Sequence, residues 1–357
     1  MKTYRLAVIP GDGIGREVIP EGLRVLRTAA AQFGFGIEAE EFPWGCDYYL
    51  RCGTMMPPDA LVTLRRFDAI YLGAIGDPRV PDHVSLWGLL LPIRKAFDLY
   101  ANVRPIRLLP GIPSPLAGRA PEEIDILFVR ENTEGEYAGI GGRMAVGTPH
   151  EVAVQTSVYT RRATERILRY AFEQARRRRR RLAHITKSNA LQYTAVMWDE
   201  IAAEVARDYP DVHVSKLHVD AAAYHMVLHP DWFDVMVGSN LFADILTDLG
   251  AALQGSLGLA ASANLDPTRA HPSMFEPVHG SAPDIAGRGV ANPLAAIWTG
   301  SLLLEHLGEG PAAAAVFDGL REVVRQGRVR TPDLGGSSTT AQVGEAVAAA
   351  LRAGAPR

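Results

Sequence analysis

Short apolar runs alternate with helical stretches along the chain, and this alternation limits the folds available to it. Residues 4–9 are mostly apolar, the glycine turn PGDGIG follows them, and residues 16–31 carry apolar side chains at helical spacing. Similar short runs recur at residues 69–73 and 124–130, with helical segments between them. Strands that alternate with helices favour an α/β fold with much parallel sheet. The pattern predicts the fold class and leaves the strand order open.

The composition excludes several classes of protein. With 357 residues, 47% of them apolar, the chain is long enough for two domains and is neither disordered nor collagen-like. A net charge of −3 gives no overall attraction to nucleic acid or membranes, and no apolar run is long enough for a membrane span. Two cysteines, Cys46 and Cys52, are too few for a disulfide framework, and the first residues do not resemble a signal peptide. We therefore expect a cytoplasmic protein with no nucleic-acid or membrane partner.

Two acids stand four residues apart in an otherwise apolar helical stretch, GSNLFADILTDLG at residues 238–250. Asp244 and Asp248 would share one helix face, where two like charges repel unless a cation or a shared proton compensates them. Carboxylate oxygens suit Mg²⁺ and Mn²⁺. The alternative is a pair of acids on a solvated face or near the start of a helix. The fragment alone leaves both interpretations open.

Three arginines lie close to the predicted ends of strands and helices. Arg94 and Arg104 occur in LPIRKAFDLYANVRP, and Arg130 ends IDILFVR. The planar guanidinium group suits bidentate recognition of carboxylates, so the three could hold a small dianionic acid. Surface salt bridges are the alternative, and spacing alone does not decide between them.

Acid/base chemistry has three candidate residues. Tyr137 lies beside a glycine-rich turn, and Lys187 follows a short apolar run in HITKSNA. A desolvated lysine can act as a base, and a tyrosine can donate a proton to a developing enol. Asp220, in VDAAAYHMV, is a candidate third metal ligand. Each of these residues, taken alone, is more often structural or solvated.

The irregular segment FEPVHGSAPDIAGRGVANP, residues 275–293, concentrates polar side chains and glycines. A long loop of this kind usually has a function. Asp284 could bond the ribose hydroxyls of NAD and would repel the extra phosphate of NADP. The PGDGIG turn is similar to a phosphate loop, but it matches neither the dinucleotide fingerprint nor a Walker loop.

Residues 176–181 are six consecutive arginines after a helical pattern. They could form a nucleic-acid patch. The alternative, which we prefer, is that cations at the end of an exposed helix are favoured by its dipole and simply solvated. No interleaved aromatic residues or second basic cluster supports RNA binding.

Together these motifs resemble those of the β-decarboxylating dehydrogenases, the family of isopropylmalate, isocitrate and tartrate/D-malate dehydrogenases. The resemblance extends from PGDGIG to TPDLGG at residues 331–336. It implies a two-domain, non-Rossmann α/β fold. A discontinuous large cofactor-binding domain would join residues 1–99 with 251–357, and residues 100–250 would form a smaller domain with the dimer interface.

The resemblance also implies roles for the candidate residues. Three arginines would clamp the substrate carboxylates, two acids would bind Mn²⁺ or Mg²⁺ with a third acid from the partner subunit, and Lys187, which also crosses the interface, would assist deprotonation. Tyr137 would protonate the enol left by decarboxylation. The clamp is Arg94, Arg104 and Arg130, and the metal ligands are Asp244, Asp248 and Asp220.

A cofactor site is implied in the same way, with NAD as the cofactor and K⁺ as a further candidate. Relatives that use NADP tend to carry a lysine where this chain has Asp284, which favours NAD. The active sites would be shared within an obligate homodimer, and a tetramer is not excluded. The implied cofactor contacts are Ile14, Gly73, Glu276, His279, Gly280, Ser281, Ala282, Asp284, Ile285 and Asn292.

Substrate choice would depend on the segment VSLWGLLLPIR, in which Trp87 and Leu90 precede the first arginine. The Trp-Gly pattern, with RENTEGEYAGIGGRM and EVAVQTSVYTRR, is most similar to the tartrate/D-malate subgroup. We expect oxidation of D-malate to pyruvate and CO₂, or of tartrate. The apolar residues 89–93 leave 3-isopropylmalate as an alternative, and a non-catalytic RNA-associated protein is the alternative from another class.

Overall fold

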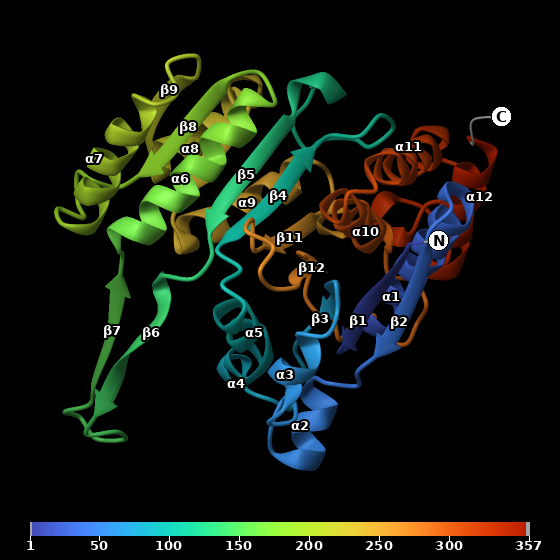
Figure 1. The fold of residues 1–357 in the computed structure, drawn as a ribbon, viewed down its shortest axis with the longest axis horizontal. Helices are drawn as coiled ribbons and strands as arrows, with labels where there is room; N and C mark the ends of the chain where they lie inside the picture. The colour runs from blue at the N-terminus through green and yellow to red at the C-terminus, as the bar shows by residue number, and fades with distance from the viewer. Residues whose placement is uncertain (1, 355–357) are drawn as a thin grey trace. The chain divides into compact units, whose positions relative to one another are not determined.

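The computed structural model describes residues 2–354, and the chain divides into two compact units (Figure 1). Unit 1 comprises Met1–Leu99, Arg107–Pro121 and Ala251–Arg357, and unit 2 comprises Tyr100–Ile106 and Glu122–Gly250. We had assigned residues 107–121 to the smaller domain, whereas they belong to unit 1. Between the end of β4 at Arg107 and Pro121 this proline- and glycine-rich segment forms no strand or helix, so periodicity gave no guide to its place.

Unit 1 is built on five strands in the order β2-β1-β3-β12-β11. Neighbours are parallel except β11 and β12, which run antiparallel. Every residue of β3 is buried, which explains its continuous apolar sequence AIYLGA, because a parallel strand covered on both faces shows no alternation. The strands are β1 (Thr3–Gly11), β2 (Gly36–Glu41), β3 (Ala69–Ala74), β11 (Ala261–Leu265) and β12 (Ser273–Pro277).

The helices of unit 1 lie on both sides of its strands. The long helix α1 packs against α10 and α12, and α10 packs in turn against α11 (Figure 1). A short π-helix, residues Leu86–Leu90, leads directly into α5. The α-helices are α1 (Gly15–Phe33), α2 (Cys46–Cys52), α3 (Ala60–Leu64), α4 (Asp82–Ser85), α5 (Leu91–Ala96), α10 (Leu294–Leu307), α11 (Gly310–Gln326) and α12 (Thr340–Ala353).

Unit 2 contains a second set of strands in the order β4-β5-β10-β8-β9, of which β5, β10, β8 and β9 are parallel. Helix α6 packs on this set at β5, β8 and β10, and α7 packs against α6. The strands are β4 (Ala101–Arg107), β5 (Asp125–Glu131), β8 (Arg181–Thr186), β9 (His213–His218) and β10 (Val235–Gly238). The helices are α6 (Arg161–Arg176), α7 (Thr194–Ala206), α8 (Val219–Leu228) and α9 (Asn240–Leu253). The predicted α/β class with mostly parallel sheet is confirmed.

Two further strands of unit 2, β6 (Gly135–Met144) and β7 (Val152–Val158), pair only with each other as an antiparallel ribbon that leaves the body of the unit (Figure 1). We call this ribbon the arm. It exposes Ile140, Met144, Val146, Val152 and Val154. A contiguous set of exposed apolar side chains marks an interaction surface more often than a solvated one.

No helix within residues 2–354 is long and apolar enough to cross a membrane.

Part of the arginine run is bound into unit 2, which corrects the expectation of simple solvation for Arg178 and Arg179 but not for the exposed Arg177 and Arg180. Arg178 donates from Nε to Asp234 at 2.7 Å, and the backbone N–H of Arg179 donates to the other oxygen of the same carboxylate at 2.7 Å. The Asp234 side chain is fully buried, and that of Arg178 is 20% exposed. Arg176 instead pairs with the half-exposed Asp211 at 2.8 Å. A buried carboxylate needs such partners because charge is costly to remove from water.

Replacement of Asp234 by Ala should lower the free energy of unfolding by about 3–5 kcal/mol, because it leaves the Arg178 guanidinium without its buried partner. Urea unfolding followed by circular dichroism measures the change. The matched control is Asp211→Ala, which removes an arginine pair at the surface and should cost about 1 kcal/mol or less. Equal losses in the two variants would contradict a special role for the buried pair.

Candidate active site

Four of the predicted site residues meet in unit 2, around Asp244 on α9. The Arg130 guanidinium donates to Asp244 Oδ1, and Arg104 Nη1 lies 3.3 Å from the same oxygen. The Tyr137 hydroxyl donates to Oδ2 at 3.0 Å. These residues come from β5, β4 and β6, so three strands and a helix supply one cluster. We call Arg104, Arg130, Tyr137 and Asp244 the Asp244 cluster.

Side chains of α9 that we did not predict hold both arginines in place. Asn240 Oδ1 accepts hydrogen bonds from Arg130 Nε at 2.9 Å and Nη2 at 2.7 Å. Thr247 Oγ1 accepts one from Arg104 Nη1 at 2.6 Å. Arg130 is 2% exposed and Arg104 is 7% exposed. Asn240 and Thr247 stand four residues before and three residues after Asp244, so helical periodicity could have placed all three on one face.

Asp248 lies one turn further along α9 and is the second acid of the predicted metal pair. Burial, together with the negative charge of Asp244, raises the pKa of Asp248, although the charges of Arg104 and Arg130 act in the opposite direction. A divalent cation would offset the repulsion, and the donor set of carboxylate oxygens fits Mg²⁺ or Mn²⁺. Within residues 2–354, no three acidic, histidine or cysteine side chains are grouped closely enough to hold a metal ion. Two ligands of the predicted three therefore share a helix, and the third, Asp220, lies elsewhere in this chain.

Lys187 and Asp220 form a second group in unit 2. Lys187 Nζ lies 2.8 Å from Asp220 Oδ1, and its hydrogen bond is the main cause of the lowered pKa of Asp220. The Asp220 side chain is 69% exposed and that of Lys187 is 27% exposed. Lys187 follows the last residue of β8, and Asp220 lies in the first turn of α8, directly after the neighbouring strand β9.

The third predicted arginine belongs to unit 1. Arg94, on α5, donates from Nη2 to Glu276 Oε1 at 2.6 Å, and Asn264 Nδ2 donates to the same oxygen at 2.9 Å. The sequence had not indicated Asn264. Trp87 is exposed with Lys95 Nζ 4.7 Å from its ring centroid, and Leu90 is half-buried.

The predicted cofactor loop of unit 1 is held against the start of α1. The backbone N–H of Ile14 donates to Ser281 O at 2.9 Å. Glu17, which we did not predict, accepts from the backbone N–H groups of Gly287 at 2.6 Å and Gly289 at 2.8 Å. A Cβ atom on Gly13 would lie 2.0 Å from Ser281 O, so only glycine allows this close approach.

Other residues of the same loop differ in environment. His279 is buried, and burial lowers its pKa, so the imidazole is neutral near pH 7. Asn292 Nδ2 donates to Asp333 Oδ2 at 3.0 Å, which adds Asp333 to the neighbourhood. Asp284 is exposed and Ile285 is half-buried. Gly73 has a packing role, because a Cβ atom there would lie 2.1 Å from Pro10 O.

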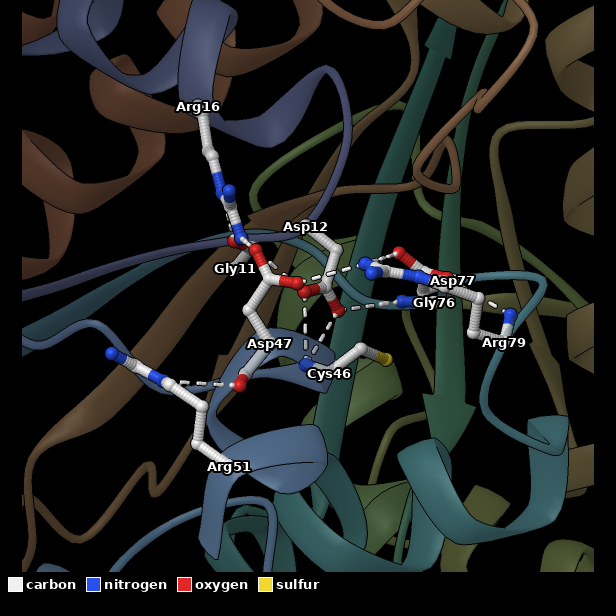
Figure 2. Close-up of polar contacts among 9 residues, drawn as sticks. All are labelled: Gly11, Asp12, Arg16, Cys46, Asp47, Arg51, Gly76, Asp77 and Arg79. Carbon is white, nitrogen blue, oxygen red and sulfur yellow. Dashed lines mark hydrogen bonds and ion pairs between the residues drawn. The ribbon is translucent and has the colours of Figure 1, made fainter.

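The PGDGIG turn forms a junction through its acid (Figure 2). Asp12 is 2% exposed and accepts from the backbone N–H groups of Cys46 at 2.9 Å and Gly76 at 3.0 Å. It thereby ties the second glycine turn, residues 73–78, to the start of α2. Burial raises the pKa of the Cys46 thiol to about 12, so this cysteine stays protonated. The aspartate of PGDGIG therefore binds backbone N–H groups of neighbouring segments, a structural role that the similarity to a phosphate loop had not indicated.

Two of the arginines beside this junction, Arg16 and Arg79, are paired with acids, whereas Arg51 donates to the backbone carbonyl of Asp47 (Figure 2). Arg16 Nη2 donates to Asp47 Oδ2 at 2.7 Å, and Arg79 Nη2 donates to Asp47 Oδ1 at 2.8 Å and to Asp77 Oδ2 at 2.7 Å. The bonds to Arg79 are the main cause of the lowered pKa of Asp77, about 2. The charges of Arg16 and Arg79 are therefore neutralised by neighbouring acids of the same surface.

Known proteins resemble the chain over nearly its whole length. A family described as isocitrate/isopropylmalate dehydrogenase matches residues 5–347. The chain is 53% identical over 355 residues to the D-malate dehydrogenase [decarboxylating] of Escherichia coli, covering 97% of this chain and 98% of that protein. It is 53% identical over 353 residues to a probable tartrate dehydrogenase/decarboxylase of Agrobacterium vitis, covering 98% of each.

A solved structure gives the same result for the fold. The isocitrate dehydrogenase of Methylococcus capsulatus superposes with a TM-score of 0.88 at 38% identity, covering 98% of this chain and 99% of that one. The predicted resemblance and the predicted dehydrogenase-like α/β fold are confirmed. The chain belongs to the isocitrate/isopropylmalate dehydrogenase family.

Proposed function

We propose that the protein is an NAD-dependent and divalent-metal-dependent dehydrogenase of a small 2-hydroxy dicarboxylate. The preferred reactions are oxidation of D-malate to pyruvate and CO₂ and oxidation of tartrate. The observation that carries the proposal is the Asp244 cluster, in which two buried arginines and a tyrosine converge on one acid of a paired set. Relatives with about half their residues identical are named for these two substrates.

The arginines would bind the carboxylates of the substrate. Arg104 and Arg130 are held by Thr247 and Asn240, so their guanidinium planes are oriented before a substrate arrives. A carboxylate that meets preorganised, desolvated donors gains specificity because little side-chain entropy is lost on binding. Arg94, fixed by Glu276, completes the proposed clamp.

Asp244 and Asp248 would hold Mn²⁺ or Mg²⁺, with Asp220 of a second copy as the third ligand. The metal supplies positive charge that lowers the pKa of the substrate hydroxyl and stabilises negative charge as it develops. Asp244 is paired with Arg104 and Arg130 and accepts a hydrogen bond from Tyr137, so metal and substrate binding would require these groups to redistribute. K⁺ remains a further candidate cofactor.

Lys187 and Tyr137 would move the protons. Lys187 would assist removal of the hydroxyl proton as hydride leaves C2 for NAD. Tyr137 would donate its phenolic proton to the enol carbon after decarboxylation. The Arg130 guanidinium lies 5.5 Å from the Tyr137 ring centroid, which favours negative charge on the phenol during this transfer.

A homodimer is part of the proposal, because Lys187 and Asp220 form one group in this chain and Asp244 and Asp248 form another. A second copy could bring the two groups together. Exposed apolar side chains on the arm and on α8 and α9, among them Tyr224, Leu228 and Ile245, offer a surface for it.

NADH formation with Mn²⁺ across D-malate, the tartrate isomers, 3-isopropylmalate and isocitrate tests the proposed substrates. We expect kcat/KM for D-malate or a tartrate isomer to exceed that for isocitrate by at least about 100-fold, because the apolar residues 89–93 offer no polar side chain for a third carboxylate. A clear preference for 3-isopropylmalate would favour the leucine-synthesis alternative. A clear preference for isocitrate would contradict the substrate assignment.

The variant Asp248→Ala should lower metal-dependent kcat/KM by more than about 100-fold with the fold retained, because it removes one of the two acids on α9. Isothermal titration with Mn²⁺ should show weakened metal binding, and circular dichroism checks the fold. Asp318→Ala, at an exposed position on α11, is the matched control. Normal activity of Asp248→Ala without added metal would contradict the proposed metal-binding role of this residue.

The variant Asp284→Lys should shift cofactor preference from NAD toward NADP by about tenfold or more in the ratio of kcat/KM values. The substitution replaces a charge that repels the 2′-phosphate by one that attracts it, at an exposed position. Steady-state kinetics with both cofactors measures the ratio. Arg288→Lys, which keeps the charge of the same exposed loop, serves as the control, and an unchanged ratio in Asp284→Lys would count against the assigned role.

A further inference from the structure

Asp199, on helix α7, lies beside the segment that carries Lys187. Lys216 Nζ donates to Asp199 Oδ2 at 2.7 Å and reaches Ser188 Oγ at 3.5 Å. His184 Nε2 lies 3.3 Å from the other carboxylate oxygen. The Asp199 side chain is 15% exposed and that of His184 is 3% exposed. We call Asp199, Lys216, His184 and Ser188 the Asp199 cluster.

The Asp199 cluster joins the two strands from which Lys187 and Asp220 depart. His184 and Lys216 are register partners on the parallel strands β8 and β9, and Thr186 pairs with His218 at their ends. Lys187 directly follows the end of β8, and α8, which carries Asp220, directly follows the end of β9. The Asp199 carboxylate therefore bonds to β9 through Lys216 and lies close to His184 of β8, the two strands from which the Lys187–Asp220 pair departs.

The charges of the cluster make Lys216 the counter-ion of Asp199. Burial lowers the pKa of His184 to about 4, with Asp199 opposing the shift and Lys216 adding to it, so His184 is neutral near pH 7. Burial would raise the pKa of Asp199, but the hydrogen bond from Lys216 and other nearby polar groups outweigh it, and the pKa lies below its usual value. Asp199 is thus an anion whose partner Lys216 also reaches Ser188, the residue that follows Lys187.

We propose that Asp199 is a positioning residue for Lys187: through Lys216 and Ser188 it fixes the segment 186–188 against β9. The inference rests on the proposed function, in which Lys187 assists deprotonation. The lysine side chain is long and flexible, so its ammonium group is only as well placed as the backbone from which it extends. A displacement of about 1 Å at a reacting group can cost about 100-fold in rate.

The ion pair itself is a poor candidate for a purely structural role. The Lys216 side chain is 54% exposed, and pairs with an exposed partner contribute little to stability. Removal of the Asp199 charge should therefore change turnover more than it changes folding. The nearby Glu200 is exposed on the same helix, which offers a matched substitution of the same chemistry.

The test compares Asp199→Asn with Glu200→Gln in the full-length protein, with D-malate, Mn²⁺ and NAD. For Asp199→Asn we expect kcat to fall about 10- to 100-fold, with KM for D-malate within about twofold and the melting temperature within about 3 °C of the parent. Glu200→Gln should match the parent in all three. Lys216→Met removes the counter-ion from the solvent side and should lower kcat in the same direction, so the test holds even where Asp199→Asn does not fold.

A double variant separates positioning from an independent effect. If Asp199 acts through Lys187, adding Asp199→Asn to Lys187→Ala should leave the residual kcat unchanged within about twofold. Multiplicative losses in the double variant, or an unchanged kcat in both Asp199→Asn and Lys216→Met, would overturn the positioning role while the proposed function stands. Full activity of Lys187→Ala would instead overturn the proposed role of Lys187, and the inference with it.

Discussion

Two buried arginines that face one aspartate are the interaction on which the rest of the proposed site depends. Arg104 and Arg130 are almost fully removed from water, and a guanidinium group in that position must be paired or its burial becomes costly. Asp244 provides the negative charge, and Asn240 and Thr247 provide further acceptors on the same helix. A substrate carboxylate has the same charge and hydrogen-bond acceptors as Asp244. The contact that stabilises the arginines in this structure and the proposed contact with substrate are therefore both carboxylate–guanidinium pairs.

The position of these groups follows from the strand arrangement of unit 2. Parallel strands end at a common edge, and polar residues that follow their carboxyl ends converge there. Arg130 lies near the end of β5, Lys187 follows β8, and α9 begins just after β10. Strands β5, β8 and β10 are themselves mostly apolar and buried, whereas the edge strand β9 is polar and more exposed. Proposed site residues lie both within buried strands, as Arg104 and Arg130 do, and after the end of a strand, as Lys187 does. Asp199 and Asp234 are buried or half-buried acids that join neighbouring elements.

Unit 1 uses acids in a similar way to hold its loops. Asp12 bonds two backbone N–H groups from different segments, and Glu17 bonds two from the predicted cofactor loop. A carboxylate accepts several hydrogen bonds at once, so a single buried acid can fix a turn that has no periodic structure. The loop at residues 278–292 is thus ordered by α1 without the help of a strand or helix of its own.

The sequence by itself determined the features that depend on neighbours along the chain. Asp244 and Asp248 share a helix face because helical periodicity depends only on neighbouring residues. The apolar runs at residues 4–9, 69–73 and 124–130 form strands, as their continuous apolar sequence predicted. The family resemblance also allowed the candidate arginines, tyrosine, lysine and aspartates of the site to be predicted from their sequence motifs. Asn240, Thr247 and Glu17 gave no signal beyond their place on a helix.

Only the tertiary structure decided which distant residues meet. Arg130 and Asp244 are separated by 114 positions, and Asp234 lies more than 50 positions from the arginines that it holds. The same is true of Asp12, which contacts residues 34 and 64 positions away. Such contacts follow from strand order and register, and a local pattern of apolar and polar residues specifies neither. That is why the arginine run looked solvated in the sequence and is partly buried in the fold.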